Sequence, residues 1–183
     1  MKVEPIRDLG ILEECYKYLD ARSKRDSLLF RTGIFTGLRI SDILKLRVRD
    51  IYNKSRLDVK QTKTGNMVNI PIHPKLKKII KTYVEENNLQ SYSLLFRSRK
   101  GINKAITRQQ AYNIFNDMAK AIGMENIGTH TLRKTFGYHM YKANENNLGV
   151  VMEVLGHKDS SSTLRYIGIT DIDINNAIRN LPF

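Results

Sequence analysis

The sequence has a single cysteine, Cys15, in 183 residues. None of its apolar stretches approaches the roughly 20 residues that span a bilayer. One cysteine can form neither an internal disulfide nor a multi-cysteine metal site. The first ten residues, MKVEPIRDLG, lack the apolar run of a signal peptide. We therefore expect a cytoplasmic protein with no membrane partner.

The sequence is equally poor in motifs that bind metals or nucleotides. Its histidines show neither the i, i+4 pair of a helical zinc site nor a surrounding cluster of carboxylates. There is no Walker loop and no glycine fingerprint for a dinucleotide. We therefore expect no metal and no cofactor, which disfavours a metal-dependent nuclease.

Positive charge is what the sequence has in excess. It contains 31 Lys and Arg against 18 Asp and Glu, a formal net charge of +13. Contacts between such residues and phosphates release condensed counterions, so a polyanionic partner is favoured. We rank nucleic acid above a basic surface without function, and an anionic membrane third. The apolar fraction of 41% separates the chain from disordered basic tails.

Hydrophobic periodicity predicts one mainly helical domain with a small sheet. Ser41 is expected to cap the third helix, and Pro74 to start the fourth. The helices are expected at about 6–21, 27–35, 41–46, 74–87, 107–122, 130–142, 147–155, 160–166 and 172–180. Short apolar runs at 51–52, 57–59 and 67–70, separated by turn residues, predict a three-stranded antiparallel sheet.

Four segments combine basic residues with tight local structure: TGLRISD at 36–42, QTKTGN at 61–66, HTLRK at 130–134, and LGH at 155–157. Tyr166 follows the last of them. Arg39 lies near a helix N-terminus, which favours anions. Taken singly, each residue has a simpler explanation: a surface arginine, a solvated turn lysine, a structural histidine or a core tyrosine. Only their order and spacing together are specific.

The series Arg, Lys, His-x-x-Arg, His, Tyr resembles the active site of the tyrosine recombinases, also called the phage integrase family. The phrases that carry this resemblance are TGLRISDIL at 36–44, QTKTG at 61–65, HTLRKTFGYHM at 130–140 and LGHKDSSSTLRY at 155–166. The resemblance implies the catalytic-domain fold of that family. It also implies a metal-independent, site-specific recombinase or integrase that cuts and rejoins DNA through a 3′-phosphotyrosyl intermediate.

The resemblance assigns a role to each residue of the series. Arg39 and Arg133 would clamp the scissile phosphate, and Tyr166 would be the nucleophile. Lys63 would protonate the leaving oxygen and His130 would be the base. The remaining assignments are His157 as a hydrogen-bond donor to a nonbridging oxygen and Asp42 as the acidic residue that braces the first arginine.

Further basic residues are expected to contact duplex DNA, although a solvated charged loop would explain most of them too. They are Arg97, Arg99, Lys100, Lys104, Arg108 and Lys134. Lys134 is equally compatible with either explanation.

The resemblance also implies a domain organisation and an assembly. Residues 1–170 would form the catalytic domain, and 171–183 a tail helix that packs in cis or exchanges between protomers of a homotetramer on paired sites. The chain begins almost directly with the catalytic domain, so the family's DNA-clamping N-terminal domain is expected to be absent from it. Many members carry a histidine two residues after the nucleophile, where this chain has Gly168. The DNA served would belong to a mobile element.

Three other functions remain open. A type IB topoisomerase-like enzyme would use the same residues but relax supercoils as a monomer. A DNA-binding regulator would keep the fold without activity, although all six expected residues are present. A generic RNA-binding domain is the weakest alternative, because aromatic residues make up only 8% of the chain.

Overall fold

The computed structural model describes residues 3–169, 173, 175, 178–179 and 181–182. In chain order its elements are α1 (Leu9–Arg22), α2 (Lys24–Thr36), α3 (Ile40–Ile43), α4 (Val48–Ile51), β1 (Arg56–Lys60), β2 (Met67–Pro71), α5 (Pro74–Glu86), α6 (Arg108–Ala121), α7 (Thr129–Ala143), α8 (Leu148–Leu155) and α9 (Ser160–Ile167). The expected tail helix at 172–180 lies outside the described residues for most of its length. None of the described helices is long and apolar enough to cross a membrane.

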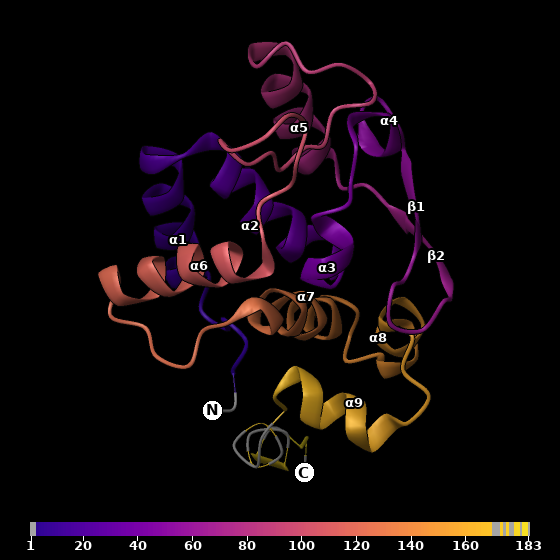
Figure 1. Cartoon of the computed structure of the whole chain (residues 1–183). Coiled ribbons are helices and arrows are strands. Elements are labelled where there is room, and N and C mark those ends of the chain that lie inside the picture. Colours follow the sequence, from indigo (N-terminus) through magenta and orange to yellow (C-terminus); the bar gives the residue numbers. More distant parts are fainter. Residues whose placement is uncertain (1–2, 170–172, 174, 176–177, 180, 183) are drawn as a thin grey trace.

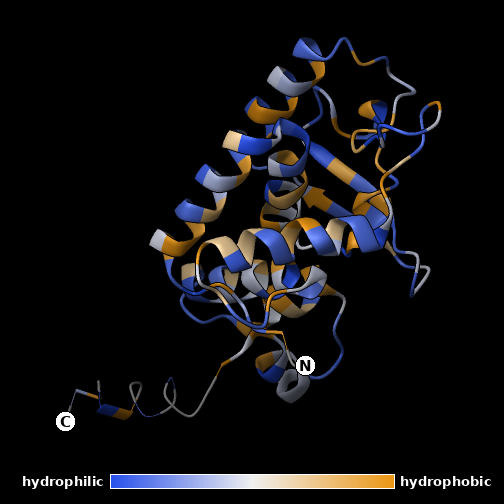
Figure 2. Ribbon diagram, turned by 60° about the vertical axis from the view of Figure 1, so that its left-hand side comes forward, coloured by the Kyte–Doolittle hydropathy of each residue, from blue (hydrophilic) through white to orange (hydrophobic). Residues whose placement is uncertain are grey.

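Helix α7 lies between two hydrophobic cores (Figure 1). The larger core forms among α1 to α6 and includes the fully buried Phe30 and Phe115, whose rings meet edge-on at 5.8 Å. The smaller core contains Val151, Leu155 and Ile167 from α8 and α9. Orange and blue alternate along the helices in Figure 2, as expected of amphipathic helices around a core. The helix that carries His130 and Arg133 is therefore held from both sides.

Glycines let α2 approach α7 closely. A Cβ on Gly33 would lie 2.5 Å from Cδ1 of Leu132. Gly37, which ends α2, has a φ of 63°, in the left-handed region that favours glycine. A Cβ there would lie 2.3 Å from the ring of Phe136. The turn that leads to Arg39 thus depends on Gly37 for both its backbone conformation and its packing.

The expectation of a three-stranded sheet is wrong, because the described residues contain a two-stranded one. β1 and β2 pair antiparallel, with Leu57 opposite Ile70. The proposed first strand, Ile51–Tyr52, ends α4 instead: the Tyr52 N–H donates to the carbonyl of Val48 at 2.8 Å. A carboxylate oxygen of Asp50 accepts from the backbone N–H that precedes α4, at 2.8 Å, and this bond favours the helical turn.

Of the two helix starts expected from the sequence, one is confirmed and the other is wrong. Pro74 is the first residue of α5, as expected. Ser41, however, lies inside α3, which begins at Ile40, and Arg39 takes the cap position without making a side-chain cap bond. The Arg39 side chain is therefore available to the cleft described below.

We predict that Gly37→Ala destabilises the fold by roughly 2–5 kcal/mol, because it combines left-handed strain with overpacking against Phe136. Gly65→Ala is the matched control: Gly65 has a φ of 72° but nothing within 4 Å of its added Cβ. That variant should lose only about 1–2 kcal/mol. Urea unfolding monitored by circular dichroism measures both. Equal losses would show that the contact with Phe136 contributes nothing.

Candidate active site

One cleft of about 480 Å³ collects all six residues of the predicted catalytic series. Its walls come from the turn between α2 and α3, the β1–β2 hairpin, α7, and the segment from α8 into α9. The lining residues are Arg39, Ile40, Ser41, Thr62, Lys63, Arg108, Thr129, His130, Arg133, His157 and Tyr166. Residues more than 120 positions apart in sequence, such as Arg39 and Tyr166, therefore face one space.

Arg133 is the buried centre of this cleft, with 2% of its surface exposed. Its Nη1 donates to the carbonyl of Gly37 at 2.6 Å, and its Nη2 donates to the carbonyl of Leu155. Burial lowers the pKa of Arg133, while Tyr166 and Asp42 act in the opposite direction. A guanidinium stays protonated at neutral pH, so a fixed positive charge faces the cleft.

Arg39 is positioned by Gln61, a residue that the sequence did not single out. The Arg39 Nη1 donates to Oε1 of Gln61 at 2.7 Å, and the Thr64 hydroxyl donates to the same oxygen at 2.9 Å. Gln61 is 2% exposed although it lies at the base of a hairpin tip. The sequence held no signal for this role, because burial of a hairpin amide and its long-range hydrogen bond are set by the tertiary packing. The hairpin that carries Lys63 is thus tied to Arg39.

The structure gives Asp42 a different partner from the one expected. Its Oδ1 accepts from the backbone N–H of Thr62 at 3.0 Å and from the Thr62 hydroxyl at 2.5 Å. Asp42 is 2% exposed, and the Arg39 guanidinium donates its side-chain hydrogen bond to Gln61. The expectation that Asp42 braces Arg39 is corrected accordingly: its carboxylate fixes the hairpin immediately before Lys63.

The hydroxyl of Tyr166 points at the groups expected to act on it. It lies 3.4 Å from Nδ1 of His130, and its ring meets that of His157 edge-on, with centroids 5.0 Å apart. Burial raises the pKa of Tyr166, and the positive charges of Arg133 and Arg39 oppose this rise. The arrangement keeps the phenol protonated at rest while placing an acceptor and two cations beside it.

Both histidines of the cleft are disfavoured as cations. Burial lowers the pKa of His130, and Arg133, Arg39, Lys63 and Arg108 lower it further. Burial also lowers the pKa of His157, again with Arg133 and Arg39 adding to the effect. The lowered pKa favours neutral His130 at neutral pH, and in the Nε2–H tautomer its Nδ1 can accept the proton of Tyr166.

The residues predicted to contact DNA separate into two groups. Arg108 lines the cleft, and Lys134 is only 7% exposed, with its Nζ 5.4 Å from the ring centroid of Tyr166. Lys134 thus belongs beneath the tyrosine and not on an outer DNA-binding surface. The other four are exposed on the loop that precedes α6: Arg97, Arg99, Lys100 and Lys104.

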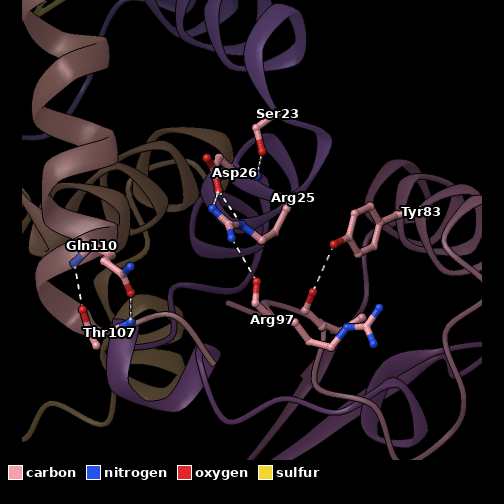
Figure 3. A network of polar contacts seen from close by, with 8 residues as sticks. Ser23, Arg25, Asp26, Tyr83, Arg97, Thr107 and Gln110 are labelled. Atoms are coloured by element: carbon pink, nitrogen blue, oxygen red, sulfur yellow. Dashed lines mark hydrogen bonds and ion pairs between the residues drawn. The ribbon is translucent and has the colours of Figure 1, made fainter. Parts of the chain in front are cut away.

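Hydrogen bonds from side chains to backbone carbonyls hold this loop in place (Figure 3). The guanidinium of Arg25 donates to the carbonyl of Arg97 at 2.9 Å, and the Tyr83 hydroxyl donates to the carbonyl of Leu95 at 3.3 Å. Thr107 and Gln110 then form a capping box that starts α6. Arg108 is the first residue of that helix, so the cap places its side chain at the cleft.

Comparison with known sequences identifies relatives along most of the chain. The model of the Phage integrase family matches residues 10–171. The "Probable integrase/recombinase YoeC" of Bacillus subtilis (strain 168) is 44% identical over 169 residues, covering 92% of this chain and 91% of that protein. "Tyrosine recombinase XerA" of Pyrococcus furiosus is 28% identical over 170 residues, and the match covers 91% of this chain but only 59% of that protein.

Solved structures share the fold at low sequence identity. A XerA recombinase has a TM-score of 0.80 at 16% identity over 100% of this chain and 67% of its own. A XerH site-specific recombinase bound to a palindromic difH substrate has a TM-score of 0.78 at 21% identity, over 96% of this chain and 52% of its own. These likenesses agree with the mainly helical fold and its small antiparallel sheet. The chain belongs to the phage integrase family, that of the tyrosine recombinases, and contains its catalytic domain.

Proposed function

We propose that this chain cleaves and rejoins double-stranded DNA through a 3′-phosphotyrosyl bond on Tyr166. One observation carries the proposal: the Tyr166 hydroxyl shares a cleft with two guanidinium groups and lies 3.4 Å from Nδ1 of His130. A phosphodiester in this cleft would meet fixed positive charge where negative charge develops in the transition state. The relatives named as recombinases support the same conclusion.

The two arginines would bind the scissile phosphate. Arg133 donates one N–H each from Nη1 and Nη2 to carbonyls and also hydrogen-bonds Tyr166, and a guanidinium has five such donors, so the others can face a phosphate. Arg39 lines the same cleft, held by Gln61. Guanidinium groups bind nonbridging oxygens in a bidentate manner, which a lysine cannot reproduce.

The proton transfers follow from the positions of the remaining groups. Tyr166 gives its proton to Nδ1 of His130 as its oxygen attacks phosphorus. The P–O5′ bond breaks, and Lys63 donates a proton to the departing 5′-oxygen. The covalent bond to Tyr166 retains the energy of the phosphodiester, so the reverse reaction rejoins the DNA without a nucleotide or a metal.

We further propose that the enzyme acts as a homotetramer on paired sites of a mobile element, with residues 1–170 as the catalytic domain and 171–183 as a tail exchanged between protomers. The exposed Arg97, Arg99, Lys100 and Lys104 would hold the flanking duplex. An inactive regulator is disfavoured because Tyr166 lies beside Arg39 and Arg133 in the cleft. A topoisomerase-like enzyme would instead relax a supercoiled plasmid that carries no recombination site.

We predict that Tyr166→Phe abolishes a covalent protein–DNA adduct, because phenylalanine lacks the attacking oxygen. The substrate is a nicked duplex carrying the crossover site of the element that encodes the chain, and the adduct is detected on a denaturing gel. Tyr112→Phe, on the exposed part of α6, is the matched control and should leave the adduct unchanged. If the unaltered protein binds this duplex and forms no adduct, the proposed chemistry is wrong.

We predict that adduct formation rises with pH through the pKa of His130. That pKa lies below the usual 6.5 because of burial and neighbouring cations. At subsaturating DNA the profile reports the free protein, so the base is lost only when pH falls through this lowered pKa and activity should persist to mildly acidic pH. Rates measured between pH 4.5 and 8 for the unaltered protein and for His130→Gln test this. A rising limb that survives in His130→Gln would assign it to another group.

A further inference from the structure

The side chain of Thr163 lies against His157 beneath the cleft. Thr163 is fully buried on α9, and its Oγ1 lies 3.2 Å from Nδ1 of His157. The same oxygen donates to the carbonyl of Asp159, one turn earlier, at 2.6 Å. A hydroxyl has a single hydrogen, so only its lone pairs remain for His157.

This geometry decides which histidine nitrogen carries the proton. If Nδ1 of His157 were unprotonated, its lone pair would face a lone pair of the Thr163 oxygen at 3.2 Å. The only escape would be for the Thr163 hydroxyl to turn its hydrogen away from the Asp159 carbonyl oxygen, which lies 2.6 Å away. That alternative would leave a carbonyl oxygen in contact with a hydroxyl oxygen without a hydrogen between them. Nδ1 is therefore the donor, and neutral His157 has its lone pair on Nε2.

We propose that Thr163 is a positioning residue, which locks His157 in the Nδ1–H tautomer so that Nε2 can donate to a phosphate oxygen only when the imidazole is protonated. This inference rests on the proposed function, because the phosphate belongs to the DNA. It changes the expected role of His157, which is then not a permanent donor. His157 then donates a hydrogen bond to the phosphate only in its charged form. Thr163, which controls this, lies on the same helix as Tyr166.

The charges around His157 set the conditions for that switch. Burial, Arg133 on α7 and Arg39 before α3 lower its pKa and so favour the neutral imidazole. Tyr166 on its own helix meets the imidazole edge-on. The other titratable groups that line the cleft are Lys63 on the hairpin, Arg108 on α6 and His130 on α7. A bound phosphodiester would place a negative charge beside His157 and favour the protonated imidazole.

The tautomer can be measured in the free protein, without DNA. Long-range ¹H–¹⁵N NMR spectra of protein labelled at histidine distinguish a protonated Nδ1 from a protonated Nε2, and His157→Gln assigns the signals. Above the pKa of His157 we expect the Nδ1–H tautomer in the unaltered protein and in Thr163→Ser, which keeps the hydroxyl. In Thr163→Val, of nearly the same shape, the Nε2–H tautomer should predominate.

Observing Nε2–H in the unaltered protein, or Nδ1–H in Thr163→Val, would overturn the inference. Circular dichroism checks that each variant is folded, and Thr163→Ser keeps the test valid if valine disturbs the core. Because no DNA is present, this result does not depend on whether the proposed recombinase chemistry is correct.

A pH profile then tests the consequence for catalysis. In the unaltered protein and in Thr163→Ser, adduct formation on the nicked duplex should fall as pH rises through the pKa of His157 in the complex. Thr163→Val should lose this falling limb, because its neutral histidine donates through Nε2, and so should His157→Gln. A purely structural role for Thr163 would lower the rate equally at all pH values, which would contradict the inference. Failure of the unaltered protein to form any adduct would instead contradict the proposed function.

Discussion

The arrangement of the cleft depends on the buried guanidinium of Arg133. It donates to the carbonyl of Gly37, which caps α2, and to that of Leu155, the last residue of α8. Carbonyls at helix C-termini lack partners within the helix and carry partial negative charge, which stabilises a buried cation. Each acceptor lies two residues before a catalytic candidate, Arg39 or His157. One side chain thus fixes the walls that carry the other groups.

Burial and the same concentration of cations together set the protonation states of the cleft residues. Arg133 and Arg39 lower the pKa of both histidines, and they oppose the rise that burial causes in the pKa of Tyr166. An anion that enters the cleft raises the pKa values of the two histidines again, because it stabilises their positively charged forms. This charge distribution suits the proposed phosphodiester substrate and agrees with the net charge of +13.

Helices were predictable where periodicity and caps agreed, as for α5 with Pro74 at its start. The series from Arg39 to Tyr166 was predictable only through the family resemblance, since a single residue type at a single position says little. The third strand failed because 51–52 is a short apolar run, and Asp50 favours a helical turn there. Gln61 and the true partner of Asp42 were missed because long-range hydrogen bonds leave no local pattern in a sequence.

The hairpin links the proposed acid to the proposed clamp. Gln61 holds Arg39, Thr62 is held by Asp42, and Lys63 follows directly on the exposed tip. The departing oxygen and the nonbridging oxygens belong to one phosphorus atom, so the proton donor and the arginine must keep a fixed relation during the reaction. Anchoring the residues before Lys63 to the elements that carry Arg39 provides this relation, and it leaves the lysine free to follow the leaving group. The buried Gln61 and Asp42, which anchor the base of the hairpin, therefore serve the proposed chemistry as well as the fold.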